Sequence, residues 1–235
     1  GLVYNGVEKM EEIDLAYLAG FTDAQGCISI CKSQGEYTFQ FFIGNKESTT
    51  INWIYKIFGG NISVRQNGFF LWHTRVHEAI SIIQQIHPYL RVKQKQAELA
   101  LKFSETLQLH GGPKKVLTPE IMVLRENIYR ELCRHNQTSN IEEEYGSGTY
   151  TDTLNLSYIA GFVDGDGCIT PKNNWRQIYI TNTNFAIIDW LQSKIGGRTY
   201  MRKGWKNPIK ALYTLKNESE TILKNLQPYF KLKGV

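Results

Sequence analysis

A nine-residue segment that occurs twice is the feature that most constrains the fold of this chain. Residues 18–26 read LAGFTDAQG, and residues 159–167 read IAGFVDGDG. The two copies lie 141 positions apart in a chain of 235 residues. An internal repeat of this length predicts two similar halves rather than one continuous unit.

Each copy is predicted to form a helix with a defined start and end. Asp14 and Asn155 stand at equivalent positions, and we expect them to be N-caps because their side-chain oxygens can accept from the open N–H groups of the first turn. Gly26 and Gly167 predict a C-terminal stop in the left-handed conformation.

Small residues in the middle of both helices predict that the helices pack against each other. Ala19 and Gly20 in the first copy correspond to Ala160 and Gly161 in the second. A glycine inside a helix costs roughly 1 kcal/mol relative to alanine. Close approach of the two backbones offsets this cost, because small residues permit it.

Packing of the two helices would bring Asp23, Gln25, Asp164 and Asp166 to one end of their interface. Paired carboxylates suit a divalent cation, Mg²⁺ especially, which keeps several waters and is held by one or two carboxylates and by substrate phosphates. The alternative is that these acids only cap helix ends. Their occurrence in register in both copies favours the metal site.

The two segments resemble the paired motif of the LAGLIDADG homing endonucleases of the monomeric, two-motif type, and the likeness covers nearly all of the chain. In that family the acid before the final glycine ligates the catalytic metal, and the matching positions are Gln25 and Asp166. The resemblance implies a metal site that also includes Ala24 and Gly165. The cation would be Mg²⁺, or Ca²⁺ or Mn²⁺ in its place. Gln25 departs from the pattern because its side chain is neutral.

The order of periodic segments agrees with the fold that the resemblance implies. After each motif the apolar period changes from helical to alternating; in the first half, for example, Ile28 and Ile30 face inward, as do Ile62 and Val64. We expect an α/β (α+β) fold of two pseudo-twofold αββαββα repeats. Each repeat would be a four-stranded antiparallel sheet backed by helices, packed through the motif helices.

The predicted domains are an N-terminal half at 1–109, a helix-containing linker at 110–153 and a C-terminal half at 154–235. The last helix of the first half should run to about Leu109. In the linker, Pro119 should open a helix that continues to about Arg134.

Outward side chains of the predicted strands are candidates for DNA contact. The resemblance implies that the two sheets form a saddle over a long double-stranded DNA site, with these side chains in the major groove. An ordinary solvated sheet face would look much the same. The candidates are Ser29, Cys31, Ser33, Thr38, Gln40, Ser63, Arg65, Trp72, Thr170, Lys172, Gln177, Tyr179, Arg198, Tyr200, Arg202 and Lys210.

Charge supports a nucleic-acid partner in the second half above all. The chain has a formal net charge of +5. Residues 168–217 contain nine Lys or Arg and a single acid, Asp189. Such a bias favours the phosphate backbone as a partner.

Further landmarks repeat near the end of each half. His87-Pro88-Tyr89 corresponds to Gln227-Pro228-Tyr229, and Lys93 corresponds to Lys233 at the same offset. By position, the resemblance implies that Lys93 and Lys233 are basic active-site residues. It also implies that Asn45 and Asn182 hold water near the scissile phosphate.

The implied reaction is metal-assisted phosphodiester hydrolysis that cuts both strands and gives staggered ends. Gln25 should hold a hard divalent ion far less firmly than a carboxylate, so activity of this chain is expected to be impaired. An introduced Glu-to-Gln change, a partly degenerate enzyme and a strand-nicking enzyme each explain it. The main alternative is a non-cleaving DNA- or RNA-binding protein of the same fold, either an intron splicing cofactor or a regulator. A basic protein–protein adaptor explains neither the helix glycines nor the acids.

The remaining sequence features bear on location. Four cysteines, Cys27, Cys31, Cys133 and Cys168, have no zinc or disulfide spacing. The sequence shows no signal peptide and no apolar run that predicts a membrane span. We expect an intracellular monomer with no membrane partner, in the matrix of a chloroplast or mitochondrion if an intron there encodes it.

Overall fold

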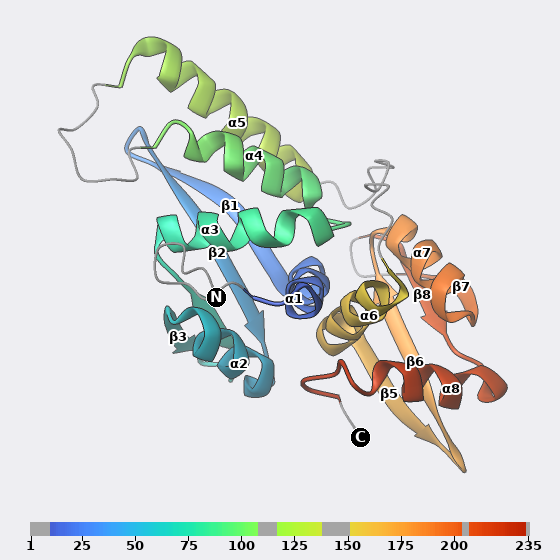
Figure 1. Ribbon diagram of the computed structural model, residues 1–235. Coiled ribbons are helices and arrows are strands. Elements are labelled where there is room, and N and C mark those ends of the chain that lie inside the picture. The colour runs from blue at the N-terminus through green and yellow to red at the C-terminus, as the bar shows by residue number, and fades with distance from the viewer. Residues whose placement is uncertain (1–9, 108–116, 138–150, 204–206, 234–235) are drawn as a thin grey trace.

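Two similar halves flank a central pair of helices in the computed structural model, which describes residues 10–107, 117–137, 151–203 and 207–233 (Figure 1). The first half contains α1 (Glu12–Gln25), β1 (Gly26–Ser33), β2 (Glu36–Asn45), α2 (Ser48–Phe58), β3 (Asn61–Val64), β4 (Phe70–His73), α3 (Val76–Ile86), the 3₁₀ turn η1 (His87–Tyr89) and α4 (Gln94–Ser104). Then comes α5 (Pro119–Gln137). The second half contains α6 (Asp152–Asp166), β5 (Gly167–Lys172), β6 (Trp175–Asn182), α7 (Phe185–Ile195), β7 (Arg198–Arg202), β8 (Ile209–Tyr213) and α8 (Lys216–Leu226).

Each half forms one antiparallel four-stranded sheet, and the two sheets have the same topology. The strand orders are β1-β2-β4-β3 and β5-β6-β8-β7. Helices α1 and α6 lie side by side in the centre, with α2 to α5 on the side of the first sheet and α7 and α8 on the side of the second (Figure 1). The predicted fold class, with paired αββαββα repeats, is confirmed.

The first hairpin shows how the sequence pattern sets the faces of a sheet. Its turn has positive φ at Gln34 (50°) and Gly35 (82°), the backbone that a tight two-residue hairpin needs. Ile28 pairs with Phe41, and both are buried against the helices. Because successive side chains alternate, the intervening residues of these strands face away from the helices.

Backbone contact between α1 and α6 is as close as the glycines predicted. A Cβ atom on Gly20 would lie 2.0 Å from the carbonyl oxygen of Tyr158, and one on Gly161 would lie 2.0 Å from that of Tyr17. Neither position has room for a side chain. The close approach of the two motif helices is therefore confirmed.

The predicted helix ends need correction. Helix α1 begins after Glu11 and α6 after Thr151, whose hydroxyl accepts from the Leu154 N–H at 3.4 Å, so Asp14 and Asn155 are not N-caps. They lie inside the first turns. Gly26 and Gly167 have extended backbones (φ −83° and −89°), not left-handed ones, because each begins a strand directly after the helix.

Other elements also differ from their predicted limits. Val64 was expected to face inward but is 62% exposed, because β3 is an edge strand. Helix α4 ends at Ser104 rather than near residue 109, and α5 runs to Gln137, beyond Arg134. Residues 108–116 and 138–150, which include parts of the predicted linker, lie outside the described residues. The domain boundaries therefore stay a prediction.

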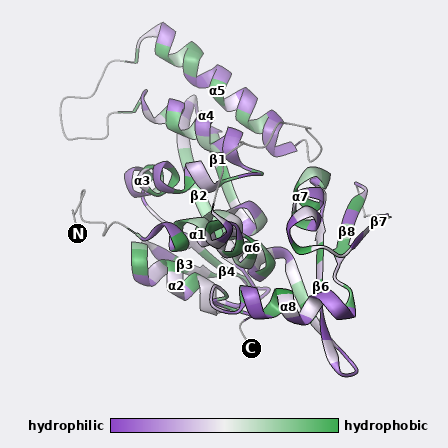
Figure 2. Ribbon diagram, turned by 45° about the vertical axis from the view of Figure 1, so that its right-hand side comes forward, coloured by the Kyte–Doolittle hydropathy of each residue, from purple (hydrophilic) through white to green (hydrophobic). Residues whose placement is uncertain are grey.

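The outer helix α5 is joined to the first sheet by polar contacts. The Glu126 carboxylate accepts from Lys32 Nζ at 2.7 Å and from the Tyr37 hydroxyl, and Asn136 Nδ2 donates to the Ile28 carbonyl oxygen at 2.9 Å. Hydrophilic and hydrophobic residues alternate along α5, as expected of a helix with one face on the protein (Figure 2). Among the described residues, no helix has both the length and the apolar composition needed to cross a membrane.

The Gly20→Ala substitution tests the central contact. We expect it to lower the free energy of unfolding by at least about 3 kcal/mol, because the added methyl group meets a backbone carbonyl that cannot rotate away. Urea denaturation followed by circular dichroism measures the change. The control is Gly35→Ala, which has a positive φ but no atom within 4 Å of the new Cβ and should cost about 1–2 kcal/mol. Equal losses in the two variants would contradict the interpretation.

Candidate metal and nucleic-acid site

The paired helices bring Gln25 and Asp166 into direct contact at their C-terminal ends. Gln25 Nε2 donates to Asp166 Oδ1 at 2.7 Å and to the Gly165 carbonyl oxygen at 3.2 Å. With the amide turned over, its carbonyl oxygen would face the carboxylate and repel it. The Gln25 amide nitrogen therefore lies between two oxygens that the sequence assigned to the metal site.

Asp166 is held from its other side by a strand residue. Asn182 Nδ2 donates to Asp166 Oδ2 at 2.8 Å, and Asn182 Oδ1 accepts from the Asn184 N–H at 2.8 Å. Burial raises the pKa of Asp166 to about 6, although the charge of Lys93 and the amide hydrogen bonds act in the opposite direction. The carboxylate is thus ionised at neutral pH, although burial makes its ionised form less stable than it would be in water.

The corresponding asparagine of the first half is in a similar turn. Asn45 Oδ1 accepts from the Glu47 N–H at 3.0 Å, as Asn182 does from Asn184. Both side chains are therefore fixed by the backbone two residues later. Among the described residues, Asn182 bonds to the motif residue Asp166 whereas Asn45 bonds to no motif residue, so the two sites are not equivalent.

Asp23 does not take part in this contact and has a structural role. Its carboxylate accepts from the backbone N–H groups of Arg91, Val92 and Lys93 at 2.7, 3.0 and 2.8 Å. It also accepts from the Tyr158 hydroxyl on α6 at 2.6 Å. Asp23 thereby joins the segment before α4 to the motif helix of the other half.

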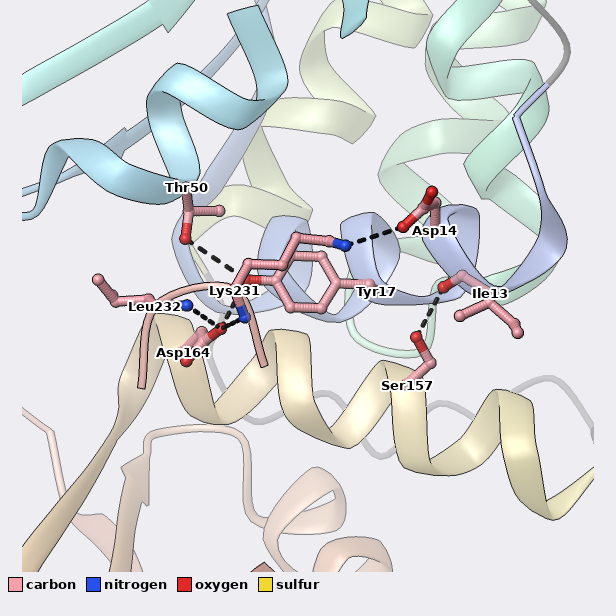
Figure 3. A network of polar contacts seen from close by, with 8 residues as sticks. All are labelled: Ile13, Asp14, Tyr17, Thr50, Ser157, Asp164, Lys231 and Leu232. Atoms are coloured by element: carbon pink, nitrogen blue, oxygen red, sulfur yellow. Dashed lines mark hydrogen bonds and ion pairs between the residues drawn. The ribbon is translucent and has the colours of Figure 1, made fainter. Parts of the chain in front are cut away.

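Asp164 makes the same set of contacts in the second half. It accepts from the backbone N–H groups of Lys231 and Leu232 at 2.9 and 3.0 Å and from the Tyr17 hydroxyl on α1 at 2.7 Å (Figure 3). It also accepts from the backbone N–H group of Lys233 at 2.8 Å. We call these two sets of hydrogen bonds the aspartate clasps. Each contains a tyrosine from the opposite half.

The clasps place Lys93 and Lys233 at the ends of the motif helices. Lys93 Nζ donates to the Asp23 carbonyl oxygen, and Lys233 Nζ donates to the carbonyl oxygens of Val163 (2.8 Å) and Asp164 (2.7 Å). These carbonyls carry the partial negative charge of a helix C-terminus, which favours a cation there. Burial lowers the pKa of both lysines.

Two cations outside the predicted set strengthen the contact between the halves. The Arg91 guanidinium lies 3.9 Å from the centre of the Trp190 ring, and Lys231 Nζ lies 4.3 Å from that of Trp53. Each also binds an oxygen on the opposite motif helix: Arg91 Nη2 donates to Asn155 Oδ1 at 3.1 Å, and Lys231 Nζ lies 2.9 Å from Asp14 Oδ1. The two polar residues predicted as caps thus hold the halves together.

Strand pairing shows which predicted DNA-contact residues face away from the helices. The residues on these outer faces are Ser29, Cys31, Ser33, Thr38, Gln40 and Ser63 in the first sheet, and Thr170, Lys172, Gln177, Tyr179, Arg198, Tyr200 and Arg202 in the second. Arg65 follows β3 and is exposed. Sequence reasoning missed Tyr213, although its alternation with the buried Leu212 could have shown it.

Trp72 and Lys210 do not lie on the outer faces, so the prediction that they contact DNA is wrong. Trp72 is fully buried, and its Nε1 donates to the Gly59 carbonyl oxygen at 2.8 Å. Lys210 has the same face as the buried Leu212 and forms an ion pair with Asp189 on α7. Both residues are in short strands, where alternation alone leaves the facing ambiguous.

The basic bias of the second half is spread over more than the sheet surface. Arg176 lies 3.6 Å from Glu220 of α8, Lys194 is on α7, and Lys216 begins α8. Lys172, Arg198 and Arg202 remain as exposed cations on the outer face. Fewer positive charges are therefore available to a ligand on this face than the nine basic residues of the sequence indicated.

The donor set at the helix ends fits a divalent cation that keeps most of its waters. Asp166 offers one carboxylate and Gly165 a carbonyl oxygen, whereas Gln25 at present directs its amide nitrogen toward both. The described residues contain no group of three or more His, Cys, Asp or Glu side chains that could hold a metal. Phosphate oxygens of a substrate would complete such a site.

Replacement of the clasp tyrosines by phenylalanine tests the link between the halves. Tyr17→Phe and Tyr158→Phe should each lower the free energy of unfolding by about 1.5–3 kcal/mol, because each removes a buried hydrogen bond to a carboxylate. The matched control is Tyr200→Phe, which loses an exposed contact and should change stability by less than about 0.5 kcal/mol. Thermal unfolding distinguishes these outcomes. A similar loss in all three variants would show that the clasps add nothing particular.

Comparison with known proteins agrees with the geometry. Residues 18–108 match the family model described as LAGLIDADG endonuclease. The chain is similar to the LAGLIDADG meganuclease I-AabMI bound to uncleaved DNA, with a TM-score of 0.69 and 15% identity over 94% of this chain and 85% of that chain. It is also similar to the homing endonuclease I-LtrWI bound to target DNA, with a TM-score of 0.66 and 19% identity over 95% and 86%.

A third similar structure is I-SmaMI bound to an uncleaved DNA target in the presence of calcium ions, with a TM-score of 0.62 and 15% identity over 96% of this chain and 86% of that chain. No curated protein matches the chain. At these identities the solved structures establish the fold, while the family model establishes the sequence relationship of the first repeat. Residues 18–108 thus match the LAGLIDADG endonuclease family model, and the chain as a whole, with its second, structurally equivalent repeat, has the fold of the similar meganucleases.

Proposed function

We propose that this protein is a site-specific endonuclease of long double-stranded DNA whose activity is impaired by Gln25. The observation that carries the proposal is the meeting of Asp166, Gln25, Lys93 and Lys233 at the ends of the two motif helices. Asp166 interacts electrostatically with both lysines, and one anionic and two cationic groups near one point suit a divalent cation and a phosphodiester. The DNA-bound state of the similar meganucleases supports the choice of substrate.

Each residue has a role that its contacts support. Asp166 would hold a divalent cation, Mg²⁺ or Ca²⁺ or Mn²⁺ in its place, with help from the backbone at Gly165 and Ala24. When bound, such a cation supplies Lewis-acid stabilisation of the phosphate charge. Asn182 orients the Asp166 carboxylate, and Asn45 is fixed in the equivalent place where it could hold a water. Lys93 and Lys233 contribute positive charge next to the scissile phosphates.

The amide of Gln25 opposes this function in two ways. It replaces a negative charge that would help to hold a hard cation. Its Nε2 also donates to the Asp166 carboxylate and the Gly165 carbonyl, and thus satisfies the oxygens that the cation would bind. A cation must break both hydrogen bonds to enter. We therefore expect weak or strand-selective cleavage rather than efficient cutting of both strands.

A non-cleaving DNA- or RNA-binding protein of the same fold, an intron splicing cofactor or a regulator, is the second candidate. Gln25 favours it, because loss of one acid leaves binding intact while it weakens catalysis. The retained Asp166, with its raised pKa and two neighbouring lysines, favours the endonuclease, since a binding protein has no need to keep a buried carboxylate ionised. The intracellular, organellar location stays a prediction.

The Gln25→Glu substitution tests the proposed function. A DNA target is first selected from a random duplex pool by binding, and each strand is then labelled separately and incubated with Mg²⁺ or with a chelator. We expect Gln25→Glu to raise Mg²⁺-dependent cleavage by at least about tenfold, roughly 1.4 kcal/mol of barrier, because it restores a charged oxygen ligand. The matched control is Gln84→Glu, which makes the same chemical change on the exposed surface of α3.

The labelled strands distinguish the outcomes. Cleavage of both strands by Gln25→Glu, with one or none cut by the unchanged chain, supports an endonuclease weakened at one ligand. Loss of all cleavage in Asp166→Asn would assign the remaining activity to this site. If none of the proteins cuts a target that it binds tightly, the endonuclease is rejected and the binding protein is supported.

A further inference from the structure

The outer faces of the two sheets have the same backbone plan but different chemistry. In the first sheet, the outward residues of the four strands include no Lys or Arg, although the exposed Arg65 follows β3 directly. These outward residues are Cys27, Ser29, Cys31, Ser33, Glu36, Thr38, Gln40, Phe42, Asn61, Ser63, Leu71 and His73. In the second sheet they include three cations and four aromatic residues: Lys172, Arg198, Arg202, Trp175, Tyr179, Tyr200 and Tyr213. The two sheets therefore share one backbone geometry but present different side chains to a ligand.

The cations of the second sheet are placed to meet a ligand. Lys172, Arg198 and Arg202 are exposed, and Arg198 and Arg202 lie two pleats apart on the same face of β7. Nearby cations on the other face are engaged within the protein, since Arg176 pairs with Glu220 and Lys210 with Asp189. The outer face thus carries a positive charge of three without an acidic residue on its strands.

Tyrosines between these cations are already ordered. The hydroxyls of Tyr179 and Tyr200 lie 3.1 Å apart, and the rings of Tyr200 and Tyr213 pack edge to face with centroids 5.9 Å apart. Side chains fixed in this way lose little conformational entropy when a ligand binds. Tyrosine hydroxyls, like arginine and lysine, bond to phosphate oxygens, which positions a duplex without reading its sequence.

The first sheet has the opposite character. Ser29 lies directly across from Gln40, and the Cys31 thiol donates to Gln40 Oε1 at 3.1 Å. Hydroxyl and amide groups can donate or accept, as base edges in the major groove require, and glutamine suits adenine in particular. The strands of this surface carry no outward Lys or Arg, and with Arg65 after β3 as a nearby cation it gains less from phosphate charge than the second sheet does.

We propose that the two sheets divide recognition unequally: the second sheet holds the phosphate backbone through Lys172, Arg198, Arg202 and the tyrosine cluster, while the first sheet selects the base sequence through Ser29, Thr38 and Gln40. This inference rests on the proposed function only in that the ligand is duplex DNA. It makes affinity and its salt dependence a property of the second half. Sequence discrimination is a property of the first.

The test measures binding of the full chain to two fluorescent duplexes, the selected target and a scrambled duplex of equal length, across a salt series without divalent cations. The variants are Arg198→Gln/Arg202→Gln for the second sheet and Ser29→Ala/Gln40→Ala for the first. A matched control, Lys194→Gln/Lys224→Gln, removes the same two charges from exposed positions on α7 and α8. Circular dichroism and thermal unfolding establish that each variant is folded.

The two surface variants should fail differently. Arg198→Gln/Arg202→Gln should weaken binding to both duplexes by a similar factor and reduce the slope of log K against log salt by about 2, since each phosphate contact contributes about 0.9. Ser29→Ala/Gln40→Ala should leave that slope unchanged and lower the target-to-scrambled affinity ratio at least about tenfold. The helix control should change neither quantity beyond a small general charge effect.

Other outcomes would contradict the unequal division of recognition and leave the proposed endonuclease function unaffected. If the Arg198→Gln/Arg202→Gln variant lowers the affinity ratio while the salt slope stays the same, the second sheet reads sequence and the division is wrong. Equal slope changes in the sheet and helix variants would show that the effect is one of net charge alone. If the unchanged chain selects no duplex at all, the proposed function fails first, so the two failures are distinguishable.

Discussion

Everything at the candidate site depends on the contact between the backbones of α1 and α6. Gly20 and Gly161 each lie under a carbonyl of the opposite helix, at a distance that leaves no space for a methyl group. This approach sets the spacing of the helix ends, and therefore the 2.7 Å contact between Gln25 and Asp166. It also brings each clasp tyrosine within reach of the aspartate in the other half. A wider helix pair would separate the catalytic candidates and leave two buried carboxylates short of donors.

The clasps convert this helix contact into the positions of the lysines. Asp23 and Asp164 hold the backbone N–H groups of Lys93 and Lys233, and the lysine ammonium groups then reach back to carbonyls at the ends of the same helices. The lysines are thus fixed at both the backbone and the side chain. Their lowered pKa values and the raised pKa of Asp166 have a common cause, which is burial at a helix end where opposite charges stabilise one another only in part.

The sequence alone was sufficient to predict features that depend on the internal repeat or on a long run of alternating apolar and polar residues. The helix contact at Gly20, the inward Ile28 and the pairing of Gln25 with Asp166 all follow from two copies in register. Short strands gave no such constraint, which is why Trp72 and Lys210 were placed on the wrong face, and Val64 is exposed because its strand lies at the edge of the sheet. The contacts of Arg91 and Lys231 with aromatic rings could not be foreseen, because their partners are remote in sequence and belong to the other half.

The aspartate clasps also limit how the two halves can change. Each clasp takes an acid from one motif helix and a tyrosine from the other, so a substitution in either half alters both. Among the described residues, no such bond joins the outer faces of the two sheets, and these faces differ in charge and in aromatic content. The architecture thereby separates a matched, nearly twofold centre from two surfaces that are free to diverge. A single chain of this design can recognise a ligand that has no symmetry of its own.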